Sequence, residues 1–285
     1  MTLLFTSSTK SPRLNLPEMS CDSHMHIFDS NYPLAPGAPN LPDALVDNYR
    51  EWQSFHGLTR CVVVAPSMYG LDNRCTLDAT DKLGNSARCI VTLSEETSHL
   101  EIESMHARGA RGFRFNLARS TLNSLDSLKV IAEKVAPLGW HLQLWMHPDG
   151  LSDVAPILRG LPVPTVLDHM AGFPLYGGQG HVGFKSLLTF LENEKIWIKL
   201  SLATAWPLLQ SNRQEISSIA KAFISVAPNR VVWGSDWPHA ITTLNGGPHP
   251  DDAKKIDILE DWVSSNMQMR SIFVDNPAAL YDFPE

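Results

Sequence analysis

Cys21-Asp22-Ser23-His24-Met25-His26, read with Trp233-Gly234-Ser235-Asp236-Trp237-Pro238-His239 near the other end of the chain, decides the fold. The first stretch sets two histidines at the end of a run that predicts a β-strand. Side chains alternate between the two faces of a strand, so His24 and His26 are expected on the same face. The second stretch places Asp236 just after a buried apolar run. A closed (β/α)8 barrel builds its site at the carboxyl ends of its strands, and here both chain ends contribute to it.

Each stretch alone also has a structural explanation. A His-x-His pair can serve packing, and an Asp that follows a strand often caps the next helix. Their occurrence together, about one barrel length apart, favours a site and an enzyme.

Strands and helices are predicted to alternate along the whole chain. Alternation of this kind predicts a parallel sheet, and eight repeats predict closure into a distorted α/β TIM barrel of the (β/α)8 type. An open doubly wound sheet is the alternative, but the Gly-rich phosphate turn that it normally carries after its first strand is missing. We expect an N-terminal extension over residues 1–18 and a single barrel domain over 19–285. The predicted strands are 19–23, 61–66, 88–92, 112–116, 141–146, 165–168, 196–201 and 231–235, and the predicted helices include 44–55, 76–83, 100–108, 124–136, 183–192, 215–227 and 254–265.

Composition narrows the class of protein. The chain has 285 residues, 44% of them hydrophobic, and a formal net charge of -7, which gives no support for nucleic-acid or membrane-surface partners. No apolar run reaches the roughly 20 residues of a membrane span. The cysteines show no CxxC spacing, which predicts reduced core thiols and a cytoplasmic protein.

Polar side chains gather at the predicted strand ends. Imidazoles and a carboxylate at one barrel mouth suit hydrolysis at a carbonyl group, with Asp236 accepting a proton from water and histidines stabilising the oxyanion. The predicted catalytic residues are Asp236, His24, His26 and His169. The predicted substrate-binding residues are Arg114, Ser67, Tyr69, Asn116, Arg119, Trp145 and His239.

Four of these motifs resemble the amidohydrolase superfamily, and most closely its lactonase branch, which is similar to 2-pyrone-4,6-dicarboxylate hydrolase. They are His24-Met25-His26, Asp168-His169-Met170, Lys199-Leu200-Ser201 and Trp233–His239. The resemblance implies a hydrolase that opens a lactone ring ester, with Asp236 activating water and the three histidines polarising the carbonyl. It also implies that Arg114 stands where binuclear relatives carry a carbamylated lysine, and that Arg114 binds a substrate carboxylate.

Two departures and one cofactor question qualify the resemblance. The pyrone-hydrolase pattern carries arginines where this chain has Met170-Ala171-Gly172 and Leu202-Ala203-Thr204, so a muconolactone-like or sugar-acid lactone is a comparable substrate. No cofactor is expected in that branch. The alternative is one Zn²⁺ held by His24, His26, His147 and Asp236. A zinc-dependent decarboxylase, a lactone isomerase and a barrel that only binds its ligand are the competing functions.

Overall fold

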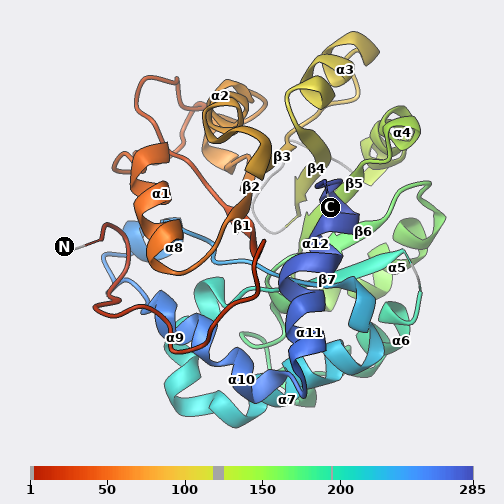
Figure 1. The fold of residues 1–285 in the computed structure, drawn as a ribbon. Coiled ribbons are helices and arrows are strands. Elements are labelled where there is room, and N and C mark those ends of the chain that lie inside the picture. The colour runs from red at the N-terminus through yellow and green to blue at the C-terminus, as the bar shows by residue number, and fades with distance from the viewer. Residues whose placement is uncertain (1–2, 118–124, 194, 285) are drawn as a thin grey trace.

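The predicted strands form one parallel sheet that curls into a barrel (Figure 1). The computed structural model describes residues 3–117, 125–193 and 195–284. Each strand pairs in parallel with the next one in the sequence, as the alternating pattern predicts. The strands are β1 (Cys21–Met25), β2 (Arg60–Val64), β3 (Ala87–Val91), β4 (Ala110–Asn116), β5 (His141–Trp145), β6 (Thr165–Leu167), β7 (Ile196–Leu200) and β8 (Val231–Trp233).

Helices surround this barrel and connect its strands (Figure 1). Six of the seven predicted helices are present with shifted ends, and the seventh, 254–265, is two short helices, Asp252–Asp257 and Leu259–Trp262. The stretch between β5 and β6 forms α5, a further helix despite Pro156 in its interior, where proline is ordinarily disfavoured. The helices are α1 (Val46–Phe55), α2 (Arg74–Leu83), α3 (His99–Ala107), α4 (Leu125–Val135), α5 (Leu151–Gly160), α6 (Phe184–Leu191), α7 (Leu209–Val226), α8 (Ala240–Leu244), α9 (Asp252–Asp257), α10 (Leu259–Trp262), α11 (Asn266–Arg270) and α12 (Asn276–Tyr281).

The barrel closes between β8 and β1 through the segment that carries Asp236. The backbone N–H of Asp236 donates to the His24 carbonyl, and that of His26 donates to the Trp237 carbonyl, both at 2.8 Å. The buried Asp22 carboxylate accepts from the Ser235 N–H at 2.9 Å and from its hydroxyl at 2.6 Å. These bonds hold Asp236 in a fixed position relative to the two histidines of β1.

One end of the barrel interior is apolar and is covered by the end of the chain. Val62, Val64 and Val166 belong to a buried cluster with Tyr281 and Phe283. Figure 1 shows the last helix, α12, lying across the strands. A second and larger apolar core lies between the strands and the surrounding helices. The polar residues of the barrel interior are therefore free to occupy its other end.

The N-terminal segment is packed against the rest of the protein. The Ser7 N–H donates to the Pro250 carbonyl at 2.9 Å, and the buried Ser8 hydroxyl donates to Asp251 at 3.0 Å. The Phe5 ring packs edge-on against Trp237, with ring centroids 5.6 Å apart. Individual contacts rather than a regular element therefore hold the N-terminal segment against the barrel domain.

One further prediction concerns the cysteines. All four are buried and free, as expected for core thiols. His56 is buried as well, and its Nδ1 lies 2.7 Å from the Trp52 carbonyl. Across the described residues, no helix combines the length and the apolar character needed to cross a membrane.

Candidate active site

His24, His26 and Asp236 converge at the end of β1. Asp236 Oδ1 lies 3.6 Å from His24 Nε2 and 3.4 Å from His26 Nε2. The two imidazole rings meet edge to face, with centroids 4.9 Å apart. β1 has one more residue than β2 between Asp22 and Met25, a bulge of the kind that often re-aims side chains beside active sites. The sequence placed these side chains on one face from strand alternation alone.

His169 joins this group from the loop after β6. Its ring centroid lies 4.9 Å from that of His24 and 5.1 Å from that of Trp145. Its Nδ1 lies 3.1 Å from the Ser201 hydroxyl. The four residues His169–Gly172 all have positive φ values, a conformation that costs free energy at each non-glycine position. Backbone strain of this kind gathers at functional sites, and here it positions the imidazole.

A buried polar network lies against His24 and is formed by three further strands or strand ends. Lys199 Nζ donates to Gln143 Oε1 at 2.8 Å and lies 3.2 Å from Asp168 Oδ1. Gln143 Nε2 donates to Asp168 Oδ2 at 3.0 Å. His24 Nδ1 lies 3.2 Å from Lys199 Nζ and 3.4 Å from both Gln143 Nε2 and Asp168 Oδ1. This network replaces the apolar layer that would otherwise fill the barrel at this level.

The surroundings of these groups determine their charges. Burial, together with the Lys199 ammonium, holds the pKa of His24 well below its ordinary value, and burial also lowers the pKa of His169. Burial opposes ionisation of Asp236, but the neighbouring imidazoles of His26, His169 and His24 outweigh it and lower its pKa. Burial likewise opposes ionisation of Asp168, and Lys199 reverses the effect, so that its pKa lies well below the ordinary value. At neutral pH the site holds ionised carboxylates beside neutral His24 and His169.

Arg114 and Asn116 project from the end of β4. Arg114 is 9% exposed, and its Nη1 donates to the Ala65 carbonyl at 3.0 Å. Asn116 Oδ1 is buried and has no hydrogen-bond partner within the described part of the chain. Both side chains remain proposed substrate-binding groups. Arg119 falls outside the described residues.

Other predicted site residues lie in different surroundings. The Tyr69 hydroxyl is engaged on both sides by the backbone of Asp29, at 2.9 and 3.1 Å, and Ser67 is exposed in the short helical turn beside it. His147 pairs with Asp149 at 3.2 Å, and its ring packs on Tyr176 with centroids 3.9 Å apart. The expected zinc ligand His147 is therefore not among the groups of the described residues that could hold a metal ion.

His239 belongs to a second buried network, which the sequence did not predict. Its Nε2 lies 3.1 Å from Asp252, whose carboxylate also accepts from Trp52 at 3.0 Å and pairs with Lys255 at 3.2 Å. Lys255 in turn donates to the Ser235 carbonyl, next to Asp236. This network braces the turn that carries Asp236. The predicted helix 254–265 gave no sign that charged side chains at its start are buried.

His24, His26 and Asp236 are close enough to hold a metal ion. Their donor atoms all lie within 4.8 Å of one another, and so do those of His24, Asp168 and His169. His24 Nε2 is buried and has no hydrogen-bond partner among the described residues. The distances thus suit a metal, and the protonation of His24 decides whether a lone pair is available to it.

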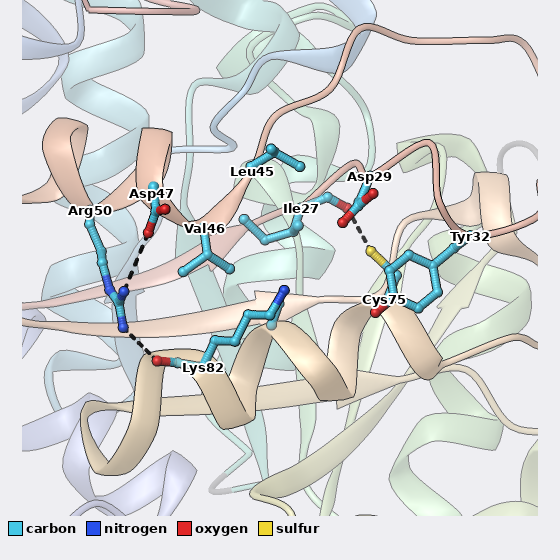
Figure 2. Close-up of a pocket in the computed structure, with 10 residues that line it drawn as sticks. Ile27, Asp29, Tyr32, Leu45, Val46, Asp47, Arg50, Cys75 and Lys82 are labelled. Atoms are coloured by element: carbon cyan, nitrogen blue, oxygen red, sulfur yellow. Dashed lines mark hydrogen bonds and ion pairs between the residues drawn. The ribbon is translucent and has the colours of Figure 1, made fainter.

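A separate pocket of about 290 Å³ lies outside the barrel between α1 and α2. Figure 2 shows Arg50 and Lys82 at one end of it and Tyr32 and Cys75 at the other. Arg50 already bonds Asp47 and the Lys82 carbonyl. None of the predicted catalytic or substrate-binding residues lines this pocket.

The pattern of these residues agrees with a known family. The family model described as Amidohydrolase matches residues 21–283. The chain belongs to the amidohydrolase family. It is an enzyme of that family. A solved structure from Agrobacterium tumefaciens has the same fold, with a TM-score of 0.85 at 24% identity, covering 96% of this chain and 99% of that one.

Three curated relatives of this amidohydrolase act on lactones. The 2-pyrone-4,6-dicarboxylate hydrolase of Comamonas testosteroni is 30% identical over 96% of this chain and 93% of its own length. The 4-sulfomuconolactone hydrolase of Hydrogenophaga intermedia is 28% identical over 94% and 90%. The D-galactarolactone isomerase of Agrobacterium fabrum is 25% identical over 96% and 94%. The lactonase branch predicted from the motifs is thereby confirmed.

Proposed function

We propose that this amidohydrolase opens the ring ester of a small carboxylated lactone by adding water. The observation that carries the proposal is the meeting of the Asp236 carboxylate with His24 and His26 at the end of β1. His169 and Arg114 supply further polar groups beside it. Hydrolases named for pyrone and sulfomuconolactone substrates are among its relatives, which supports a lactone over other carbonyl compounds.

In the proposed reaction Asp236 is the general base. His26 Nδ1 lies 2.8 Å from the Val64 carbonyl and donates to it, so a ring that carries only this proton presents a lone pair at Nε2 toward Asp236. One water molecule can donate to both acceptors. Its oxygen then bonds to the lactone carbonyl carbon while Asp236 takes its proton, and His24 and His169 stabilise the oxyanion. The ring C–O bond breaks next, and the leaving oxygen recovers the proton from Asp236 to give a hydroxy acid.

We include no metal ion in this reaction. The charged groups at the site indicate the class of substrate. Arg114 is suited to hold one carboxylate of the substrate by charge-assisted hydrogen bonds. The loop positions Met170-Ala171-Gly172 add no second arginine. A muconolactone-like or sugar-acid lactone therefore fits at least as well as a pyrone dicarboxylate.

A panel of carboxylated lactones, followed with a pH indicator, tests this function. Asp236→Asn should lower kcat by about 10²- to 10⁴-fold, the usual contribution of a general base. Its fold should persist, because Asn tolerates the positive φ of 64° found at this position. Asp149→Asn, at an exposed carboxylate, is the matched control and should retain wild-type rates. Near-normal turnover by Asp236→Asn would refute the mechanism.

A lactone isomerase is the second candidate, because the galactarolactone isomerase is among the relatives. It would convert one lactone into another without net release of acid. Product analysis by NMR separates the two functions, since only hydrolysis yields the open hydroxy acid. Metal analysis of protein purified without chelator, with activity measured before and after chelation, tests the zinc-dependent alternative.

A further inference from the structure

The buried network around His24 determines which of its ring nitrogens carries the proton. The Lys199 ammonium group can donate hydrogen bonds but cannot accept them. The Gln143 atom that lies 2.8 Å from it must therefore be the amide oxygen. The amide nitrogen then faces Asp168 Oδ2, which as a carboxylate oxygen can accept at their 3.0 Å separation. The orientation of the Gln143 amide is therefore set by its two charged neighbours.

The Lys199 ammonium has three protons to donate, and His24 Nδ1 is the third possible acceptor beside it. Among the described residues, the acceptors beside the Lys199 ammonium are Gln143 Oε1, Asp168 Oδ1 and His24 Nδ1, at 2.8, 3.2 and 3.2 Å. The second amide proton of Gln143 also faces Nδ1, at 3.4 Å. If Nδ1 carried a proton, a buried ammonium N–H would lose its acceptor, which costs several kcal/mol for a charged group.

We propose that Lys199 is a positioning residue that holds His24 with its proton on Nε2. His24 then presents an N–H group at the barrel mouth, where Asp236 Oδ1 lies 3.6 Å away, beyond hydrogen-bond distance. With a single proton His26 has the opposite arrangement, because its Nδ1 donates to the Val64 carbonyl and the lone pair is then on Nε2. The His-x-His pair thus presents one donor and one acceptor to the substrate.

The same arrangement works against a metal ion at this site. A metal ligand needs a lone pair at His24 Nε2, and such histidines normally donate from Nδ1 to a carboxylate. Asp168 stands 3.4 Å away, in position to accept that bond, but Lys199 and Gln143 donate toward the same nitrogen. His26 and Asp236 are left as two lone-pair donors, fewer than the three protein ligands of a typical catalytic zinc. The distances among His24, His26 and Asp236 suit a metal ion, but a proton on His24 Nε2 removes one of the three lone pairs.

NMR of the wild-type protein labelled with ¹⁵N-histidine tests the proposal directly. His24 is assigned by comparison with His24→Gln. We expect the spectrum of a neutral ring with the proton on Nε2 and a bare Nδ1. A proton on Nδ1 would overturn the proposal. The measurement uses no substrate, so it stands or falls independently of the lactonase function, although the catalytic role of the Nε2–H donor rests on that function.

Lys199→Met supplies a second, thermodynamic test. Without the ammonium, His24 can donate from Nδ1 to Asp168 and free Nε2, so the Zn²⁺ affinity should rise by roughly 10- to 100-fold, the usual effect of such outer partners. Lys195→Met is the matched control, because it removes another lysine, which donates to the Leu161 carbonyl at 3.3 Å and does not contact His24. Its Zn²⁺ affinity should stay at the wild-type value. Equal affinities in wild type and a folded Lys199→Met would overturn the proposal.

Discussion

The ion pair inside the barrel should be strongly coupled to stability. Lys199 Nζ and Asp168 Oδ1 are 3.2 Å apart, and neither side chain has exposed surface. Asp168→Asn leaves the ammonium without its counter-charge, and Lys199→Met leaves the carboxylate without its own. Each change should lower the free energy of unfolding by about 3–5 kcal/mol, the usual cost of breaking a buried pair on one side.

The double variant separates this coupling from general damage to the core. Two uncoupled changes would cost about 6–10 kcal/mol together, whereas removing both charges leaves no unpaired ion and should cost at least about 2 kcal/mol less. Urea unfolding, followed by tryptophan fluorescence and circular dichroism, measures all four proteins. Costs that add within about 0.5 kcal/mol would refute the coupling.

A surface pair provides the control for this cycle. Arg213 and Asp261 lie 2.7 Å apart, but their side chains are 59% and 41% exposed. Arg213→Met should cost no more than about 1 kcal/mol, because water screens and solvates both groups. The contrast between the two pairs isolates the effect of burial at similar distances.

Three further outcomes follow from the structure. Arg114→Met should raise KM for carboxylated lactones by roughly 10- to 100-fold in initial-rate assays, since a hydrogen bond to a charged group contributes about 1.5–3 kcal/mol; an unchanged KM would make Arg114 structural. The four thiols should not react with a disulfide reagent in the native protein and should all react in denaturant, because burial raises the pKa of Cys75 to about 11 and that of Cys89 to about 12. A thiol that reacts in the native state would contradict this burial. The free energy of unfolding should fall on acidification from about pH 5 to 3, and less steeply in Asp168→Asn, because the unfolded chain protonates this carboxyl before the folded one does; parallel slopes in urea titrations would contradict it.

Strand positions were predictable because buried parallel strands are apolar on both faces, a pattern that needs no knowledge of partners. The convergence of His24, His169 and Asp236 followed as well, since the carboxyl ends of parallel strands share one edge. The orientation of loop side chains was not predictable. His147 turns to Asp149, and the Tyr69 hydroxyl turns to the Asp29 backbone.

The second buried network was hidden for a related reason. Asp252 and Lys255 have an ordinary helical spacing, and their burial depends on Trp52 and His239, which come from distant parts of the chain. Gln143 and Lys199 lie within two of the predicted strands, 141–146 and 196–201. Their mutual bonds become evident only when the barrel sets their distances.

The closure of the barrel has a consequence for how the protein is made. The bonds from Ser235 to Asp22 join residues 213 positions apart, and the Ser8–Asp251 bond spans 243. A ribosome adding about 5–20 residues per second needs roughly 10–40 s to synthesise the first of these intervals. Throughout that time one edge of β1 lacks the segment around Ser235 with which it pairs. Asp236, the proposed general base, acquires its place only when nearly the whole polypeptide has emerged, so incomplete chains lack the proposed site and need the longest protection from aggregation.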